Sequence, residues 1–302
     1  MQINGVINVY KEKGYTSHDV VAKLRGILHQ KKIGHTGTLD PDAEGVLPVC
    51  LGRGTKLCDV LADHDKEYET VLLLGTVTDT QDITGTVIRT GQVNVTEDEV
   101  RECIRSFQGE QMQVPPMYSA LKVGGKKLYE MAREGIEIER RPRPVHFYNI
   151  EVIEMELPRV KIRVHCSKGT YIRTLCHDIG EKLGCGGCME KLLRTRVERF
   201  ELLGARKLSQ IQEFADRGKI EDIVIPVDQM FDSFSGCKVK QEADRLVHNG
   251  NFFPISLLEN EAIIRNTGEQ LRIYDSIGEF IGIFTKKGER MTPVKMFYSK
   301  DV

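Results

Sequence analysis

"KKIGHTGTLDPDAEGVLPVCLG", residues 31–52, joins a polar, glycine-rich run to an apolar run. The polar run holds three glycines, one histidine and three carboxylates between residues 34 and 45. Glycine permits sharp backbone bends, and Pro41 restricts the backbone directly after Asp40, so the run predicts a loop that presents a carboxylate. Aspartate before proline is also a common residue of plain turns. The residues alone leave both interpretations open.

A calcium loop is the first alternative, because Asp40, Asp42, Glu44 and Gly45 stand at its positions 1, 3, 5 and 6. Such a loop needs a bidentate glutamate at position 12, where this chain has Leu51. Leucine cannot ligate a cation, so we expect no calcium site.

Two further ligand sites also match poorly. The run lacks the lysine and the G-x-x-x-x-G-K-[ST] spacing of a phosphate-binding loop. Cys185 and Cys188 form a single C-x2-C pair, whereas a structural zinc site of this kind needs a second close pair. We therefore expect no metal.

The composition is that of a globular protein of about two domains. The chain has 302 residues, 40% of them hydrophobic, and a net charge of −1 that neither demands nor excludes nucleic acid. It contains no apolar run of about 18 residues, which predicts no membrane span. The N-terminus lacks a secretion signal, so the eight cysteines are expected to be reduced thiols in a cytoplasmic protein.

Hydrophobic spacing predicts several elements. Residues 68–75 are typical of a buried strand, and residues 160–166 alternate as in a half-buried strand. Residues 172–183 follow the helical period, so Tyr171 and Arg173 fall where a strand gives way to a helix. Thr96 and Glu99 match a capping box. After about residue 228, short strands separated by turns predict a small β-rich domain over 230–302.

The opening stretch closely resembles the signature G-H-x-G-x-L-D-P-x-A-x-G-x-L-P of the bacterial TruB family of tRNA pseudouridine synthases. Four further segments resemble the family's motifs in the family's order: KEYETVLLLGTVTDTQDITG, VPPMYSALKVGGKKLYEMAREG, CSKGTYIRTLCHDIGEKLGCGG and LLRTRV. The likeness covers most of residues 3–230. Glu12 departs from it, because the family usually has proline at that position.

The resemblance implies an α+β fold. It predicts a catalytic domain over 1–229 with a large mixed, mainly antiparallel sheet flanked by helices. An RNA-contacting insert is expected at about 110–145. Residues 230–302 resemble, more weakly, the family's RNA-binding PUA domain.

The resemblance also implies the chemistry: isomerisation of uridine to pseudouridine at position 55 in the T loop of tRNA, without a cofactor and without an obligate protein partner. The target base must flip out of the loop. Asp40 is the implied nucleophile, Arg173 is expected to pair with it and lower its pKa, and Tyr68 is expected to lie against the base.

The remaining implied residues bind the RNA. Tyr171 and Leu192 would complete the base pocket, and His35 would insert into the tRNA loop. Phosphate contacts are expected from the basic residues of the insert, Lys122, Lys126, Lys127 and Arg141. Without the family motifs, core packing is the commoner role of side chains such as Tyr171 and Leu192, and a solvated surface is the commoner role of a charge run. A tRNA-folding factor, or a synthase for another structured RNA, is the alternative function.

Overall fold

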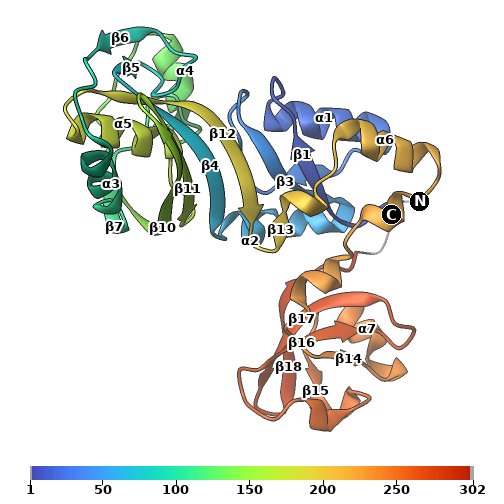
Figure 1. The fold of residues 1–302 in the computed structure, drawn as a ribbon. Helices are drawn as coiled ribbons and strands as arrows, with labels where there is room; N and C mark the ends of the chain where they lie inside the picture. Colours follow the sequence, from blue (N-terminus) through green and yellow to red (C-terminus); the bar gives the residue numbers. More distant parts are fainter. Residues whose placement is uncertain (1, 300–302) are drawn as a thin grey trace.

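The computed structural model describes residues 2–299. Residue 1 of the first predicted domain and residues 300–302 of the second lie outside the described residues. A nine-stranded sheet dominates the first 201 residues (Figure 1). Its main path is β1 (Gly5–Lys11), β3 (Glu44–Leu51), β12 (Gly187–Val197), β4 (Lys66–Leu74), β11 (Arg159–Cys166), β10 (Arg143–Glu156) and β7 (Gly109–Gln113), with β2 (Ile33–His35) on β3 and β13 (Phe200–Glu201) on β12. Every pairing is antiparallel except β12 with β3. The predicted α+β class with a mixed, mainly antiparallel sheet is confirmed.

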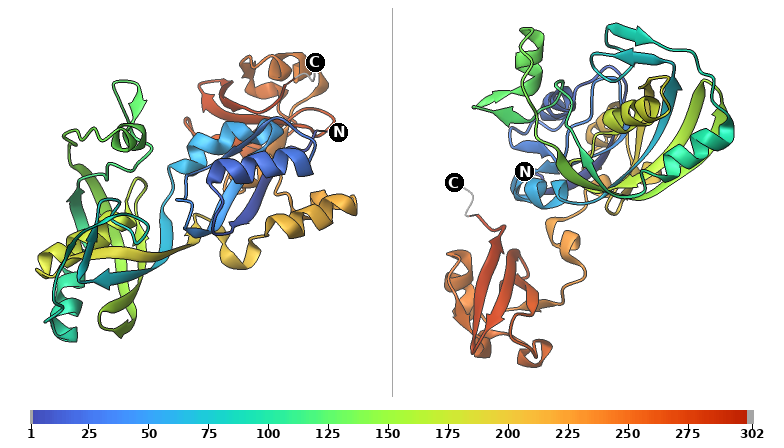
Figure 2. Two further views of the ribbon diagram at one scale, coloured as in Figure 1. Left: turned by 90° about the horizontal axis from the view of Figure 1, so that it is seen from above. Right: turned by 90° about the vertical axis from the view of Figure 1, so that its left-hand side faces the viewer.

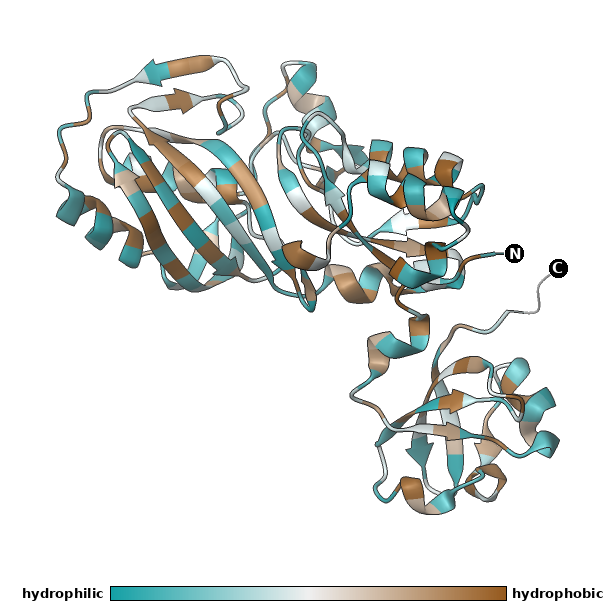
Figure 3. Cartoon of the chain, turned by 45° about the vertical axis from the view of Figure 1, so that its right-hand side comes forward, coloured by the Kyte–Doolittle hydropathy of each residue, from teal (hydrophilic) through white to brown (hydrophobic). Residues whose placement is uncertain are grey.

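The strand alternation predicted from the sequence appears in β11. Val160, Ile162, Val164 and Cys166 have no exposed surface and face the core, while the residues between them are partly exposed. Figure 3 shows the corresponding bands of hydrophobic and hydrophilic residues along the strands. Burial of one face therefore fixes the register of this part of the sheet.

Helices cover the two halves of the sheet separately. Two of them, α3 (Glu97–Arg105) and α5 (Ile172–Lys182), contribute buried residues to the core under β4, β10 and β11. Two others, α1 (Ser17–Ile27) and α6 (Leu208–Asp216), form a second core with β1 and β3. The capping box predicted at Thr96 and Glu99 begins α3. The carboxylates in the first turn of α3 also complement the positive end of the helix dipole.

Two smaller segments project around the sheet. The hairpin of β5 (Thr76–Thr78) and β6 (Val87–Thr90) follows β4. The region predicted as an insert carries β8 (Lys122–Val123), β9 (Lys126–Lys127) and α4 (Leu128–Arg133). After β3 the chain forms η1 (Gly52–Leu57) and α2 (Cys58–Ala62).

The C-terminal region has a sheet and core of its own, in agreement with the β-rich pattern. Its strand order is β14 (Gly236–Lys238), β16 (Gln270–Tyr274), β17 (Phe280–Lys287), β18 (Arg290–Met296) and β15 (Phe253–Pro254). A short helix, α7 (Asp244–His248), packs there, and Phe253 and Phe284 are fully buried. No helix within residues 2–299 is long and apolar enough to span a membrane.

The two halves of the main sheet meet at a short parallel seam. Only Leu193 with Glu44 and Arg194 with Gly45 are in register between β12 and β3. Gly45 has a φ of +107°, and a side chain there would overlap the carbonyl of Arg194. Because only glycine fits both the angle and the close approach, Gly45 fixes the seam from which the polar loop departs.

We expect Gly45→Ala to lower the free energy of unfolding by about 3 kcal/mol, because the new methyl group meets backbone that cannot move aside. Urea unfolding followed by circular dichroism measures this change. Gly26→Ala in α1 is the matched control, since a methyl group at that position meets open space. Equal midpoints for the two variants would contradict the role of Gly45.

Candidate active site

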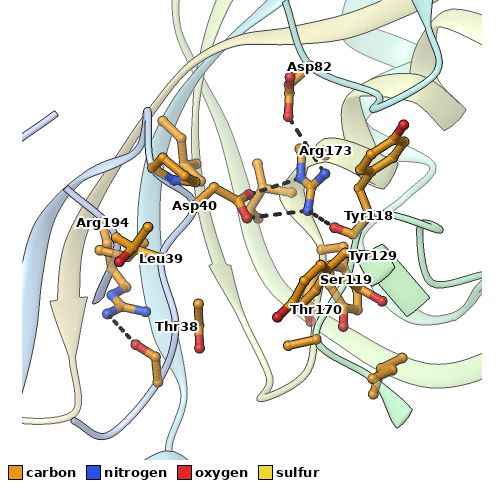
Figure 4. A pocket seen from close by; sticks show the side chains of 18 of the residues that line it. Thr38, Leu39, Asp40, Asp82, Tyr118, Ser119, Tyr129, Thr170, Arg173 and Arg194 are labelled. Atoms are coloured by element: carbon orange, nitrogen blue, oxygen red, sulfur yellow. Dashed lines mark hydrogen bonds and ion pairs between the residues drawn. The ribbon is translucent and has the colours of Figure 1, made fainter. Parts of the chain in front are cut away.

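A cavity of about 920 Å³ lies where the polar loop, the start of α5 and the insert converge (Figure 4). Its lining includes six of the residues predicted from the sequence: Asp40, Tyr68, Lys127, Tyr171, Arg173 and Leu192. The other four, His35, Lys122, Lys126 and Arg141, lie outside the lining.

Asp40 and Arg173 form an ion pair in this cavity. Arg173 Nε lies 3.0 Å from Asp40 Oδ2, and Nη2 donates to Oδ1 at 3.4 Å. The guanidinium comes from the first turn of α5 and is 5% exposed, whereas 38% of the Asp40 side chain still faces the cavity. The arrangement presents a carboxylate at the surface of the cavity and holds its cation behind it.

Arg173 also joins the segments around the cavity. Its guanidinium donates to the carbonyl oxygens of Thr80 at 3.0 Å and Tyr118 at 2.8 Å. Its Nη1 lies 3.6 Å from Asp82 Oδ2, and Asp82 is held in turn by hydroxyl and amide donors of Thr80 and Thr84. Sequence reasoning did not single out Asp82, although it lies in the quoted segment TDTQDITG.

The pKa of the Asp40 carboxyl is raised above the ordinary value for aspartate. Burial in the cleft is the largest cause, the Arg173 cation opposes it, and the nearby Asp82 carboxylate raises the pKa further. As expected, the charge of Arg173 lowers the pKa of Asp40. The expectation of a lowered pKa overall is wrong, because the other effects together raise it. The cost of desolvating the carboxylate exceeds the attraction of one cation.

Gln113 is a second residue that sequence reasoning missed. It ends β7, is 4% exposed, and clamps the backbone of Tyr171: its Nε2 donates to the carbonyl oxygen at 3.0 Å, and its Oε1 accepts from the amide at 2.8 Å. Tyr171 caps the start of α5 without using its side chain. Gln113 thus fixes the turn from which Arg173 projects. The only signal in the sequence was its place two residues before the prolines Pro115 and Pro116.

Buried cations hold the two ends of the polar loop by its carbonyl groups. Lys11 is fully buried and its Nζ donates to the carbonyls of Ala43 at 2.6 Å and Pro41 at 3.0 Å. Arg194 is 1% exposed and donates to the carbonyls of Val46 at 2.7 Å and Gly37 at 3.3 Å. Burial lowers the pKa of Lys11 to about 8.

The aromatic residues predicted at the base pocket are largely enclosed by protein. Tyr68 is 7% exposed, and burial raises the pKa of its phenol. Tyr171 and Leu192 are partly exposed at the cavity wall. Burial also raises the pKa of Tyr171. Both phenols therefore keep their protons at neutral pH, and both residues line the cavity.

His35 lies beside the cavity, at the end of β2. Its ring packs edge to face against His18 at 5.2 Å, and its buried Nδ1 has no hydrogen-bond partner within residues 2–299. Burial, together with the charges of His18 and Arg194, lowers the pKa of His35 to about 4. At neutral pH the imidazole is therefore uncharged.

The basic residues of the insert differ in availability. Lys122 and Arg141 are exposed. Lys126 forms an ion pair with Glu134, and the ammonium of Lys127 lies 5.3 Å from the ring centre of Tyr129. Within residues 2–299, no group of three or more histidine, cysteine or acidic side chains is placed to hold a metal ion.

Two family models match this chain. Residues 25–172 match the TruB family pseudouridylate synthase (N terminal domain), and residues 173–232 match the tRNA pseudouridylate synthase B C-terminal domain. The junction between the two matches falls at the start of α5. Together they include every residue that lines the cavity except Thr16 and His18.

Similar proteins and structures agree with these matches. The chain is 51% identical to tRNA pseudouridine synthase B of Lachnoclostridium phytofermentans over 98% of its own length and all of that protein. It is 46% identical to the same enzyme of Alkaliphilus oremlandii, over 95% of this chain and 94% of the relative. A solved Cbf5–Nop10–Gar1 complex contains a similar chain, with a TM-score of 0.71 and 28% identity over 97% of this chain and 84% of the other.

We expect the His35 imidazole to titrate near pH 4, because its buried position disfavours the protonated form. A pH titration followed by nuclear magnetic resonance of the ring protons measures this directly. His18→Ala removes one of the neighbouring charges and should raise the pKa of His35 toward 6.5. A wild-type midpoint near 6.5 would contradict the buried placement.

Proposed function

The chain belongs to the TruB family of tRNA pseudouridine synthases, and on this basis we propose that it converts uridine 55 in the T loop of tRNA into pseudouridine. The observation that carries the proposal is the Asp40–Arg173 ion pair at the surface of a cavity large enough for a nucleotide. We also propose that it acts in the cytoplasm and needs no obligate protein partner.

The reaction breaks the bond between C1′ of the ribose and N1 of uracil and forms one between C1′ and C5. The proton lost from C5 is balanced by the proton gained at N1, so the reaction needs no redox partner. An ionised Asp40 can act as the nucleophile at C1′ or at C6, or can support a glycal route, by splitting one difficult step into easier ones. Arg173 holds the carboxylate in place for each of these routes.

The pocket walls suit a flipped uracil. Tyr68 and Tyr171 offer aromatic surface for stacking, and Leu192 offers an apolar contact. The neutral imidazole of His35, at the rim, suits the proposed insertion into the space left by the flipped base. Lys122, Lys126, Lys127 and Arg141 are proposed to contact phosphates from the insert. Residues 230–302 are proposed to form a PUA-like domain that binds another part of the tRNA.

We expect Asp40→Asn to lower the single-turnover rate on an unmodified tRNA transcript about 10⁴-fold or more, because an amide cannot replace the nucleophile. Mapping of pseudouridine in the product RNA measures the rate and the position together. Asp42→Asn is the matched control, since its side chain is 48% exposed and has no contact with Arg173. Near wild-type modification by the Asp40 variant would refute the assignment.

We expect activity to fall as the pH drops through the raised pKa of Asp40, because only the carboxylate is nucleophilic. Arg173→Gln removes the cation that opposes this rise, so the acidic limb of the pH–rate profile should move to higher pH. Arg173→Lys keeps the positive charge, so it should shift the acidic limb of the profile less than Arg173→Gln does. An acidic limb at the same pH in all three proteins would show that Arg173 does not control ionisation of Asp40.

A further inference from the structure

Four cations gather where the main sheet domain meets the C-terminal sheet. Lys32 precedes β2, Arg53 and Lys56 lie on η1, and Lys295 lies near the end of β18. None of them was singled out from the sequence, because they are far apart along the chain. We refer to these four residues as the junction cations.

Specific contacts bring the junction cations together. Lys56 Nζ donates to the carbonyl of Met296 at 2.8 Å, which joins η1 to the end of β18. The amide of Gly52 donates to the carbonyl of Lys32 at 2.8 Å, which places Lys32 beside the start of η1. Lys295 lines an interdomain cavity together with residues of α2. The cluster is therefore built by the domain interface rather than by chance proximity of mobile side chains.

Arg53 anchors this interface. Its Nη1 lies 2.6 Å from Glu279 Oε1, and its guanidinium lies 5.6 Å from the ring centre of Tyr298. Arg53 and Glu279 thus neutralise each other across the domain boundary. The other three junction cations, Lys32, Lys56 and Lys295, are lysines.

The three junction lysines have no ion-pair partner among residues 2–299, because no carboxylate oxygen there lies within 4 Å of the ammonium groups of Lys32, Lys56 or Lys295. Burial is the largest cause of a lowered pKa at Lys56, and repulsion from Lys32, Arg53 and Lys295 lowers that pKa further. In a chain with a net charge of −1, such a group is a local concentration of positive charge, suited to a polyanion.

The segment that carries Arg53 and Lys56 lies between the insert and the C-terminal sheet (Figure 2). In both views of Figure 2 the insert (green) and the C-terminal sheet (red) project to the same side of the main sheet, with segment 52–62 (light blue) between them. The cavity is lined in part by the insert, and α2 contributes Ala62 to it. An RNA stem whose loop occupies the cavity can therefore pass over this segment on its way to the C-terminal sheet.

We propose that the three lysines of this cluster, Lys32, Lys56 and Lys295, bind backbone phosphates of the base-paired stem that carries the target loop. This inference rests on the proposed function and adds a second contact region to it, separate from the insert. Phosphate contacts of this kind position the RNA without reading its sequence. They also release counterions, so they make binding dependent on salt.

The test uses Lys32→Gln/Lys295→Gln in the full chain, because neither side chain forms a hydrogen bond or ion pair with any of residues 2–299. Lys191→Gln/Lys219→Gln removes two exposed lysines elsewhere and is the charge-matched control. We expect the first pair to raise the Kd for tRNA about tenfold at 0.1 M salt and to reduce the slope of log K against log[salt] by about 1.5. The single-turnover rate at saturating tRNA should stay at the wild-type value.

The outcomes separate the inference from the function on which it rests. If wild type and variant modify tRNA and bind it with the same Kd and salt slope, the junction-cation proposal is wrong and the proposed function stands. An equal loss in the control pair also overturns it, because only net charge would then matter. Recovery of tight binding by Lys32→Arg/Lys295→Arg supports it. If the wild-type protein neither binds nor modifies tRNA, both proposals fail.

Discussion

The ion pair between Asp40 and Arg173 is the interaction on which the rest of the cavity depends. Arg173 satisfies its remaining donors with the carbonyls of Thr80 and Tyr118, so one guanidinium joins the polar loop, the segment after β5, the insert and α5. A buried guanidinium needs such partners, because leaving its donors unpaired costs several kcal/mol. The same bonds that stabilise the cation therefore hold the segments around the substrate.

Much of this arrangement is predictable from local sequence. Alternation marks β11, the helical period marks α5, and the motif around Asp40 identifies the carboxylate that pairs with Arg173. The resemblance to one family supplied the mixed sheet and six of the residues that line the cavity. These features could be predicted because each depends on the spacing of residues within one short segment.

Features that depend on long-range placement were not predictable. Gln113 and Tyr171 are 58 residues apart, and only the position of β7 at the sheet edge brings them together. Asp82 reaches Arg173 across 91 positions for a similar reason. The net pKa direction of Asp40 also escaped sequence reasoning, since it depends on how much protein surrounds the carboxyl rather than on which cation is nearby.

The short parallel seam between β3 and β12 has a consequence for how the protein matures on the ribosome. Gly45 is synthesised 149 residues before Arg194, its partner in the seam. At a synthesis rate of about 5–20 residues per second, β12 is made roughly 7–30 s after β3, and the sheet stays incomplete for that time. β4 is also synthesised before both of the strands that pair with it, β11 and β12. Asp40 is thus present early in translation and remains without its guanidinium until α5 has emerged, so a partial chain carries the nucleophile but no assembled site.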